Sequence, residues 1–439
     1  MRQPLRVTCC VPTFNAGDTT RGVELARALV AAGASRGRQV MVTFAAPDLN
    51  GRNYEAQIRD AGFPVVHPGV VLDQRAVDRI MTADHDATEF FPDRAEADRI
   101  LAAFVNSLRS DRPDLVVYGF VPPAGIAAQI LGIPSVAYTP FPLHSAWVRR
   151  HLLKDLPEPL ANHLTMRLLL AARQGIARLV GLALHRQGFF RQPTLAQAAR
   201  AQGWRPESAD LFAMLAADVE LVHDLPAWFE GQDIGPRCTI AGPLFSRPAT
   251  GEIDPVFHAH LAPDRLRKVF LSMGSSGEKP VLLAAITALA SLDVHAVVVV
   301  PPAICSLAEV HANVAIPDRL LLTDAFVPAF AVNALADVAV IHGGQGTVQT
   351  ALHAGTPVVG VGMQAEQVSN LDNLTQRGAG IRIARSLWTP DAIARAVDTV
   401  LTTPSFRTQA LRLQQHALTL DGWKASGDAI WQMVTSRGL

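Results

Sequence analysis

The stretch Val338-Ala339-Val340-Ile341-His342-Gly343-Gly344-Gln345-Gly346-Thr347 decides the fold of the second half of the chain. Its four apolar residues predict a short buried strand, and the glycine-rich turn leads into a predicted helix over Thr347–Ala354. Such a turn leaves backbone N–H groups unpaired at the positive end of a helix, where they can bind a diphosphate. His342 can add a ring N–H and Thr347 a hydroxyl. The alternative is a core histidine beside a tight turn.

Strand and helix signals alternate on both sides of this turn, which is typical of a parallel sheet covered by helices on both faces. Helices are expected over Thr20–Ala32 and Ala124–Leu131. The predicted strands are Leu5–Val11, Val40–Phe44, Leu115–Tyr118 and Ser135–Tyr138 in the first half, and Val269–Met273, Val294–Val300, Leu320–Leu322, Val338–Ile341 and Val358–Val361 in the second. Each half is therefore expected to be a doubly wound α/β domain.

A chain of 439 residues is long enough for two domains. The stretch Leu225–Asp264 is rich in proline and glycine and is expected to contain the linker between them. We expect an N-terminal domain over residues 1–235, a C-terminal domain over residues 236–415, and a helix within residues 416–439 that packs back on the N-terminal domain.

Composition excludes several classes of protein. Lys+Arg and Asp+Glu are equal at 39 each, which argues against an extended nucleic-acid-binding surface. The 4 cysteines are too few for a disulfide scaffold and too far apart for a zinc site. No apolar run approaches the ~20 residues that span a bilayer, and the N-terminal apolar run is too short for a signal peptide. We expect a cytoplasmic protein, either a monomer or a homodimer.

The segment 147–192 departs from the alternation and is predicted to be helical throughout. It contains eight basic residues and two acids, Asp155 and Glu158. One interpretation is a solvated basic face on helices that pack over the first domain. The other is a mobile lid over the acceptor, or a surface that makes peripheral contact with anionic lipid or an anionic acceptor.

A second cluster of polar residues follows the predicted strand Val358–Val361. Met363-Gln364-Ala365-Glu366-Gln367 places a carboxylate beside a carboxamide, with Asn370 nearby. Sugar hydroxyls need both acceptors and donors in fixed directions, so this pair at the carboxyl end of a strand suits a sugar.

The sequence as a whole resembles the family-one glycosyltransferases of the GT-B fold, whose signature is His-Gly-Gly-x-Gly-Thr, then Gly-x-Pro, then an acidic residue before Gln. The resemblance implies two Rossmann-like domains that face a central cleft. It implies that His342, Gly343, Gly344, Gly346 and Thr347 bind the diphosphate of a nucleotide sugar, that Ser275 and Ser276 lie in a phosphate-side loop, that Phe326 and Val327 contact the base, and that Glu366 and Gln367 hold the donor sugar.

Most members of this family carry Gly-His before the first helix and use that histidine as the general base. Here Gly17 is followed by Asp18, as in the branch that resembles antibiotic and sterol glycosyltransferases. Members with a histidine base often pair it with an Asp after the strand that matches Leu115–Tyr118, where this chain has Gly119. A carboxylate base needs no such partner, so the two departures agree. The alternative role for Asp18 is a helix N-cap.

The sequence therefore predicts an inverting glycosyltransferase that moves a sugar from a UDP- or dTDP-sugar to the hydroxyl of a small, hydrophobic natural product, as in antibiotic biosynthesis. Asp18 would be the base, and Phe120, Phe141 and His144 would contact the acceptor. We expect no metal and no cofactor, because the helix N-terminus and His342 can stabilise the leaving group. The alternatives are a lipid-linked or anionic acceptor at a membrane surface, and a non-catalytic GT-B partner protein.

Overall fold

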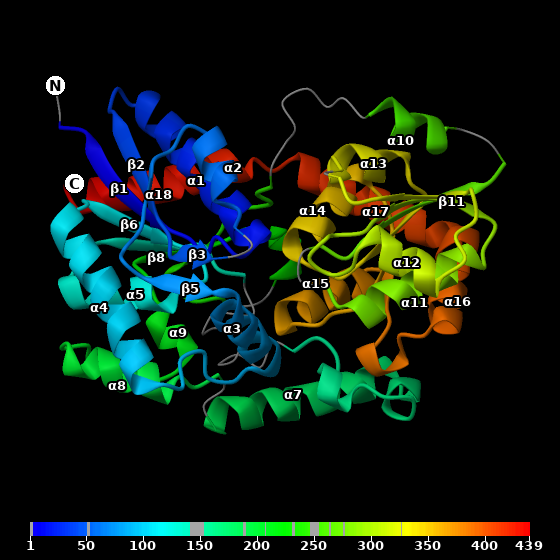
Figure 1. The fold of residues 1–439 in the computed structure, drawn as a ribbon, viewed down its shortest axis with the longest axis horizontal. Helices are drawn as coiled ribbons and strands as arrows, with labels where there is room; N and C mark the ends of the chain where they lie inside the picture. The colour runs from blue at the N-terminus through cyan, green and yellow to red at the C-terminus, as the bar shows by residue number, and fades with distance from the viewer. Residues whose placement is uncertain are drawn as a thin grey trace. The chain divides into compact units, whose positions relative to one another are not determined.

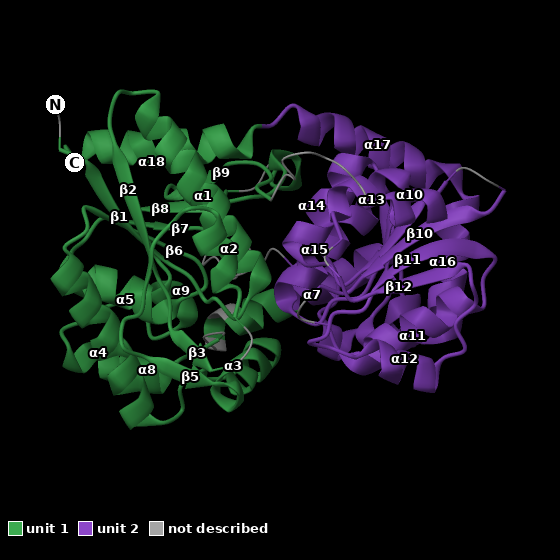
Figure 2. Ribbon diagram, turned by 45° about the horizontal axis from the view of Figure 1, so that its top comes forward, with its two compact units in different colours: residues 1–152, 180–246, 421–439 green, residues 153–179, 247–420 purple. Residues whose placement is uncertain are grey.

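The computed structural model contains two compact α/β units (Figure 1 and Figure 2). Unit 1 consists of Met1–Leu152, Val180–Ser246 and Asp421–Leu439, and unit 2 consists of Leu153–Leu179 and Arg247–Leu420. The residues that the structure describes are 3–50, 53–140, 153–187, 190–206, 208–230, 233–245, 254–262, 265–274, 277–325 and 327–439.

The core of unit 1 is a seven-stranded parallel sheet with the order β4-β2-β1-β6-β7-β8-β9. The strand order reverses between β1 and β6, and ligands of such sheets bind beyond the carboxyl ends of the strands at that point. The strands are β1 (Leu5–Cys10), β2 (Val40–Ala45), β4 (Val65–Val66), β6 (Leu115–Tyr118), β7 (Ser135–Ala137), β8 (Val219–Val222) and β9 (Cys238–Ile240), and a separate pair is formed by β3 (Asp48–Asn50) and β5 (Val71–Asp73).

Helices cover this sheet, and the last helix of the chain is one of them. Trp423 in α18 donates its indole N–H to the carboxylate of Glu24 in α1 at 2.9 Å, and Gly427 lets α18 approach the backbone of Ala28. The helices of unit 1 are α1 (Ala16–Ala34), α2 (Glu55–Asp60), α3 (Gln74–Asp86), α4 (Arg94–Asp111), α5 (Pro122–Leu131), α8 (Pro193–Ala201), α9 (Leu211–Met214) and α18 (Gly422–Ser436).

Unit 2 is built on a six-stranded parallel sheet with the order β12-β11-β10-β13-β14-β15. Its order reverses between β10 and β13. The strands are β10 (Arg267–Ser272), β11 (Val294–Val299), β12 (Leu320–Thr323), β13 (Val338–Ile341), β14 (Val358–Gly360) and β15 (Gly380–Arg382), and the helices are α10 (Pro255–His260), α11 (Lys279–Ala290), α12 (Leu307–Asn313), α13 (Ala329–Leu335), α14 (Gln345–Ala354), α15 (Ala365–Gln376), α16 (Pro390–Thr402) and α17 (Pro404–Leu418).

Unit 2 also includes a segment from the first half of the chain, Leu153–Leu179. Buried Arg382 in β15 binds Glu158 of this segment at 2.6 Å and Asp372 of α15 at 2.6 Å. Burial raises the pKa of Asp372 to about 7, although Arg382 opposes that rise. This ion-pair network anchors the segment to its own unit.

The structure differs from the sequence analysis in the helix content of one segment and in the bounds of the two domains. The segment 147–192 is not helical throughout in its described part, because only short 3-10 turns at Glu158–Leu160 and Thr165–Arg167 precede α7 (Leu170–Gln187). The sequence analysis also ended the first domain at residue 235 and included residues 153–179 in it, whereas β9 extends the first sheet to Ile240 and Leu153–Leu179 belongs to unit 2.

Candidate functional site

The glycine-rich turn lies at the carboxyl end of β13, beside the point where the strand order of unit 2 reverses. Gly343 has a φ of +81, which favours glycine, and α14 begins at Gln345 with Gly344 as its N-cap. The first N–H, of Gln345, donates to Glu366 at 3.1 Å, and that of Val348 donates to Gly344 O at 3.0 Å.

Two amides of this turn remain for a ligand. The N–H groups of Gly346 and Thr347 have no acceptor within the described part of the chain, and Gly346 is exposed. The hydroxyl of Thr347 donates to Gly344 O at 2.8 Å. Unpaired amides at the start of a helix are suited to bind an anion.

The ring of His342 occupies the space between two glycines. A Cβ atom at Gly274 would lie 2.4 Å from Cε1 of His342, and one at Gly344 would lie 2.4 Å from Nε2. Gly274 follows β10, which pairs with β13, so the ring spans the ends of the two strands at the reversal point. Any larger residue at either position would displace the imidazole.

Burial keeps His342 neutral. The side chain is 6% exposed, and burial lowers its pKa to about 4, opposed by the neighbouring backbone of Ser272. A neutral imidazole presents one N–H and one acceptor nitrogen. At neutral pH His342 can therefore contribute a hydrogen bond to a phosphate, but not a positive charge.

The start of α15 holds the turn in place. Glu366 accepts hydrogen bonds through Oε1 from Gln345 N at 3.1 Å and from Asn370 Nδ2 at 3.2 Å. Asn370 also donates to Gly343 O at 3.0 Å. These three hydrogen bonds fix the Glu366 carboxylate relative to the backbone of the glycine-rich turn.

Gln367 is occupied in the cap of its own helix. It is 1% exposed, its Oε1 accepts from Met363 N at 2.9 Å, and its Nε2 donates to Gln364 Oε1 at 2.6 Å. Gln367 Oε1 also accepts from Gln364 N at 3.4 Å, and the Gln364 side chain accepts from Gln367 N, so the two residues form a capping box at the start of α15. A contact between Gln367 and the donor sugar stays a prediction, and it requires that the cap give up one of these bonds.

Several predicted residues lie outside the described part of the chain: Ser275, Ser276 and Phe326 for the donor, and Phe141 and His144 for the acceptor. Val327 is described and buried, in an apolar cluster with Phe270 and Val332.

Asp18 lies in the first turn of α1, which follows β1 at the reversal point of the unit 1 sheet. It is not the N-cap, because Asn15 takes that role and accepts from Gly17 N at 2.9 Å and Asp18 N at 3.3 Å. The Asp18 side chain is 5% exposed and pairs with Arg21 at 2.6 Å. Arg21 thereby orients the carboxylate from the same face of the helix.

Tyr138 is a residue that the sequence analysis missed. Its hydroxyl donates to the backbone O of Asp18 at 3.2 Å. Burial raises the pKa of Tyr138 well above its ordinary value, so the group remains a hydrogen-bond donor. A Cβ atom at Gly119 would lie 2.8 Å from this hydroxyl, and one at Gly22 would lie 2.7 Å from it. Position 119, where family members with a histidine base often carry Asp, is thus closed to a side chain by the Tyr138 ring. In the sequence, the glycine at this position was the one sign of that close contact.

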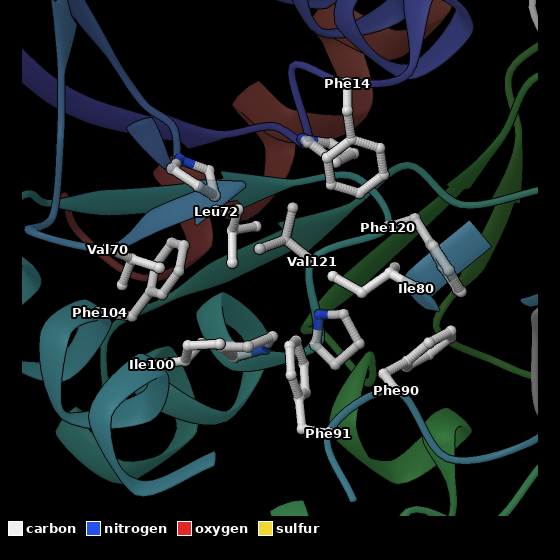
Figure 3. Close-up of a pocket in the computed structure, with 14 residues that line it drawn as sticks. Phe14, Val70, Leu72, Ile80, Phe90, Phe91, Ile100, Phe104, Phe120 and Val121 are labelled. Carbon is white, nitrogen blue, oxygen red and sulfur yellow. The ribbon is translucent and has the colours of Figure 1, made fainter. Parts of the chain in front are cut away.

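An apolar cavity of about 50 Å³ lies at the same end of the unit 1 sheet (Figure 3). Phe14 follows β1, and Phe120 and Val121 follow β6, so the cavity lies beyond the carboxyl ends of these two strands. Phe90 meets Phe120 edge to face at 5.5 Å. The full lining is Pro12, Phe14, Pro47, Val70, Leu72, Ile80, Phe90, Phe91, Ile100, Phe104, Phe120, Val121, Pro122 and Pro123.

The described residues show neither a metal-binding cluster nor a membrane-spanning helix. Among the described residues, no group of three or more His, Cys, Asp or Glu side chains could hold a metal ion. The chain contains one Asp-x-Asp, Asp84-His85-Asp86, a spacing that other glycosyltransferases use for a cation, and here it forms the last turn of α3. Within the ranges given above, no helix combines the length and the apolar composition needed to cross a bilayer.

Comparisons with known proteins agree with this arrangement. Residues 284–421 match the family of the erythromycin biosynthesis protein CIII-like C-terminal domain. The chain is 29% identical over 198 residues to a PGL/p-HBAD biosynthesis glycosyltransferase of Mycobacterium tuberculosis (45% of this chain and 44% of that protein). It is 32% identical over 215 residues to 4'-demethylrebeccamycin synthase of Lentzea aerocolonigenes (48% and 46%). The similarity thus spans somewhat less than half the length of these curated relatives.

A solved structure extends the likeness to nearly the whole chain. The glycosyltransferase VinC in complex with DTDP aligns with a TM-score of 0.63 at 20% identity, covering 97% of this chain and 98% of VinC. The fold is therefore GT-B, with two parallel-sheet α/β units. The resemblance to family-one glycosyltransferases of the antibiotic type is confirmed, and residues 284–421 match the erythromycin biosynthesis protein CIII-like C-terminal domain.

Proposed function

We propose that the chain is an inverting glycosyltransferase that transfers a sugar from a nucleoside-diphosphate sugar to a hydroxyl group of a small apolar acceptor. The observation that carries the proposal is the pair of unpaired amides at Gly346 and Thr347, at the N-terminus of α14 and beside neutral His342. These donors suit a diphosphate, whose negative charge grows as the sugar departs.

The donor is a UDP- or dTDP-sugar in this proposal. VinC, which shares the fold, was crystallised with DTDP. The carboxylate of Glu366 accepts a hydrogen bond from the turn that would hold the diphosphate, and this proximity supports the proposal that it also accepts from sugar hydroxyls. The proposal requires no metal, because the helix N-terminus and the His342 N–H stabilise the leaving group.

The apolar cavity in unit 1 supports a hydrophobic acceptor. Its lining presents ring faces and aliphatic carbons, which bind apolar surface without a demand for matching hydrogen bonds. Phe120 belongs to that lining, and a neighbouring aromatic system can stack against it or meet its edge. The names of the matched family and of 4'-demethylrebeccamycin synthase are those of natural-product biosynthesis.

Asp18 is the general base in this mechanism. The acceptor oxygen forms a bond to the anomeric carbon while its proton passes to the Asp18 carboxylate. The bond between the anomeric carbon and the phosphate oxygen breaks, and its electron pair leaves with the nucleoside diphosphate. Arg21 and Tyr138 position Asp18, since one binds its carboxylate and the other its backbone carbonyl.

A thermal-shift screen with UDP-, dTDP- and GDP-sugars tests the donor half of the proposal. A donor that binds the native state raises the melting temperature, and at a fixed concentration the rise grows with the logarithm of its affinity. We expect a rise with a UDP- or dTDP-sugar in the wild type and a much smaller one in His342→Ala. If no nucleotide sugar raises the melting temperature of the wild type, the proposed donor site is wrong.

A further inference from the structure

Exposed leucines gather on one part of unit 2. Of the twelve large apolar side chains that are exposed among the described residues, six lie within residues 160–179: Leu160, Leu164, Leu168, Leu169, Leu170 and Leu179. Leu164 and Leu169 are 76% and 82% exposed, which is rare for leucine. Such a concentration is typical of a surface that binds something.

In α7 an exposed leucine lies on the same helix face as an exposed arginine. In α7 the exposed positions include Ala171, Ala172, Gly175, Arg178 and Leu179, which recur every three or four residues and so form one stripe. The exposed stripe of α7 is therefore apolar and basic, whereas a helix face that contacts only water is normally polar.

The face carries no negative charge of its own. No Asp or Glu occurs in residues 159–187, and Arg167 and Arg178 are exposed. The two acids just before this stretch are occupied on the inner side: Asp155 pairs with Arg173 at 2.9 Å, and Glu158 pairs with Arg382 at 2.6 Å. This surface therefore combines exposed apolar side chains with positive charge.

The inner side of the segment fixes this face outward. Leu156 and Ala161 are buried in a cluster with Ala384, and Ser386 donates to Ala161 O at 2.7 Å. Gln376 donates to Lys154 O at 2.7 Å. These contacts hold the other side of the segment against unit 2. The exposed leucines could reach the core of unit 2 only if the contacts broke.

We infer that this leucine–arginine face docks on an anionic lipid surface. Helices with apolar side chains beside Arg lie in the bilayer interface, with leucines among the acyl chains and arginines at the headgroups. A second copy of the chain is a poorer occupant, because it would bring arginines against arginines. The inference is separate from sugar transfer, since it uses no residue of the glycine-rich turn.

Co-sedimentation with vesicles tests the inference on the full chain without any sugar. We expect the protein to sediment with phosphatidylcholine vesicles that contain phosphatidylglycerol, and to stay in the supernatant with phosphatidylcholine alone. Added salt should release it, because salt screens charges near the membrane.

Two double variants separate the apolar and the charged contributions. Leu164→Ser with Leu169→Ser should reduce vesicle partitioning about ten-fold or more, because two leucines no longer leave water. Arg167→Glu with Arg178→Glu should reduce it at least as much, since each arginine near an anionic surface contributes about a five-fold gain. Matched controls are Leu418→Ser and Arg412→Glu, which change an exposed leucine and an exposed arginine in α17 and should leave partitioning unchanged.

Three results would overturn the inference: no sedimentation of the wild type with the anionic vesicles, equal sedimentation with neutral vesicles, or unchanged sedimentation of the double leucine variant. A dimer in light scattering that the leucine variant turns into a monomer would also overturn it, in favour of a second copy. The donor-induced thermal shift of each variant is measured in parallel, so failure here is distinguishable from failure of the transferase proposal.

Discussion

The imidazole of His342 rests against Gly344 so closely that a single added methyl group would lie 2.4 Å from its Nε2 atom. Gly344 is also the N-cap of α14, in which the amides of Gly346 and Thr347 have no acceptor among the described residues. Gly344 thus leaves room for the histidine ring, and in the proposed donor site its missing side chain also lets the backbone approach the diphosphate.

Gly344→Ala should weaken binding of a nucleoside diphosphate about ten-fold or more, because the new Cβ displaces the His342 ring. Isothermal titration calorimetry measures the effect. The same substitution in a His342→Ala background should cost much less, because the clash is gone, and this non-additivity identifies the histidine as the intermediary. Equal costs in the two backgrounds would show that Gly344 acts without His342.

Asp18→Asn should reduce transfer about a hundred-fold or more while the affinity for the nucleotide donor stays nearly unchanged, because the amide cannot take a proton. Steady-state transfer and donor titration are measured on the same preparation. Arg21→Lys is the companion variant, since it keeps the positive charge but loses the guanidinium geometry, and it should retain more activity than Asp18→Asn. Transfer at near wild-type rate in Asp18→Asn would remove Asp18 from the role of base.

The pKa of His342 predicts a dependence of stability on pH. The folded-state pKa, about 4, lies below the ordinary value of 6.5, so the unfolded chain binds the proton more readily. The neutral ring costs no stability above pH 6.5, and stability is lost as the pH falls from there towards 4. Between pH 7 and 5 the wild type should lose about 2 kcal/mol more than His342→Asn, which cannot titrate there.

Urea unfolding at the two pH values measures this difference. The comparison uses the difference between the two proteins because other buried groups, such as Asp372, titrate in both and cancel. Parallel losses in the wild type and in His342→Asn would mean that the ring is already protonated in the folded protein or is not buried.

Much of the fold could be predicted because its central strands are continuous apolar runs. Strands β6 and β13 have the predicted bounds, since a parallel strand that is buried on both faces needs no polar residue. Strands β8 and β15 were missed because each contains a charged residue, Glu220 or Arg382, that is buried in the structure. Arg382 pairs with Asp372 and Glu158, which lie on other elements of the fold. No local sequence pattern predicts these pairs.

The site divides in the same way. The glycine-rich turn and Glu366 could be singled out because each lies in a short strand-to-helix connection that is continuous in sequence. The apolar cavity could not, because its lining comes from seven separate stretches of unit 1, between Pro12 and Pro123, that only the packing brings together. The contact between Tyr138 and Asp18 joins residues 120 positions apart, so no local pattern predicts it. The glycine at position 119 indicates only that another group fills the space beside it.

That contact gives the most specific prediction about positioning. Tyr138→Phe removes the hydrogen bond to the backbone of Asp18 and leaves the ring that fills the space beside Gly119. We expect kcat to fall about ten-fold, because a base held less firmly loses part of its orientation, while KM for the donor stays unchanged. Stability should fall by about 1 kcal/mol, the usual contribution of one buried hydrogen bond.

Tyr118→Phe is the matched control. Tyr118 is also fully buried in the unit 1 sheet and donates to a backbone carbonyl, Ala216 O, at 2.8 Å, but it does not contact Asp18. It should lose a similar amount of stability in urea unfolding and keep its kcat. Both variants keep the ring and its burial and lose one hydrogen bond from a tyrosine hydroxyl to a backbone carbonyl. If the two variants lose kcat equally, Tyr138 acts only through the stability of unit 1. If only Tyr138→Phe loses kcat, its hydroxyl positions the base.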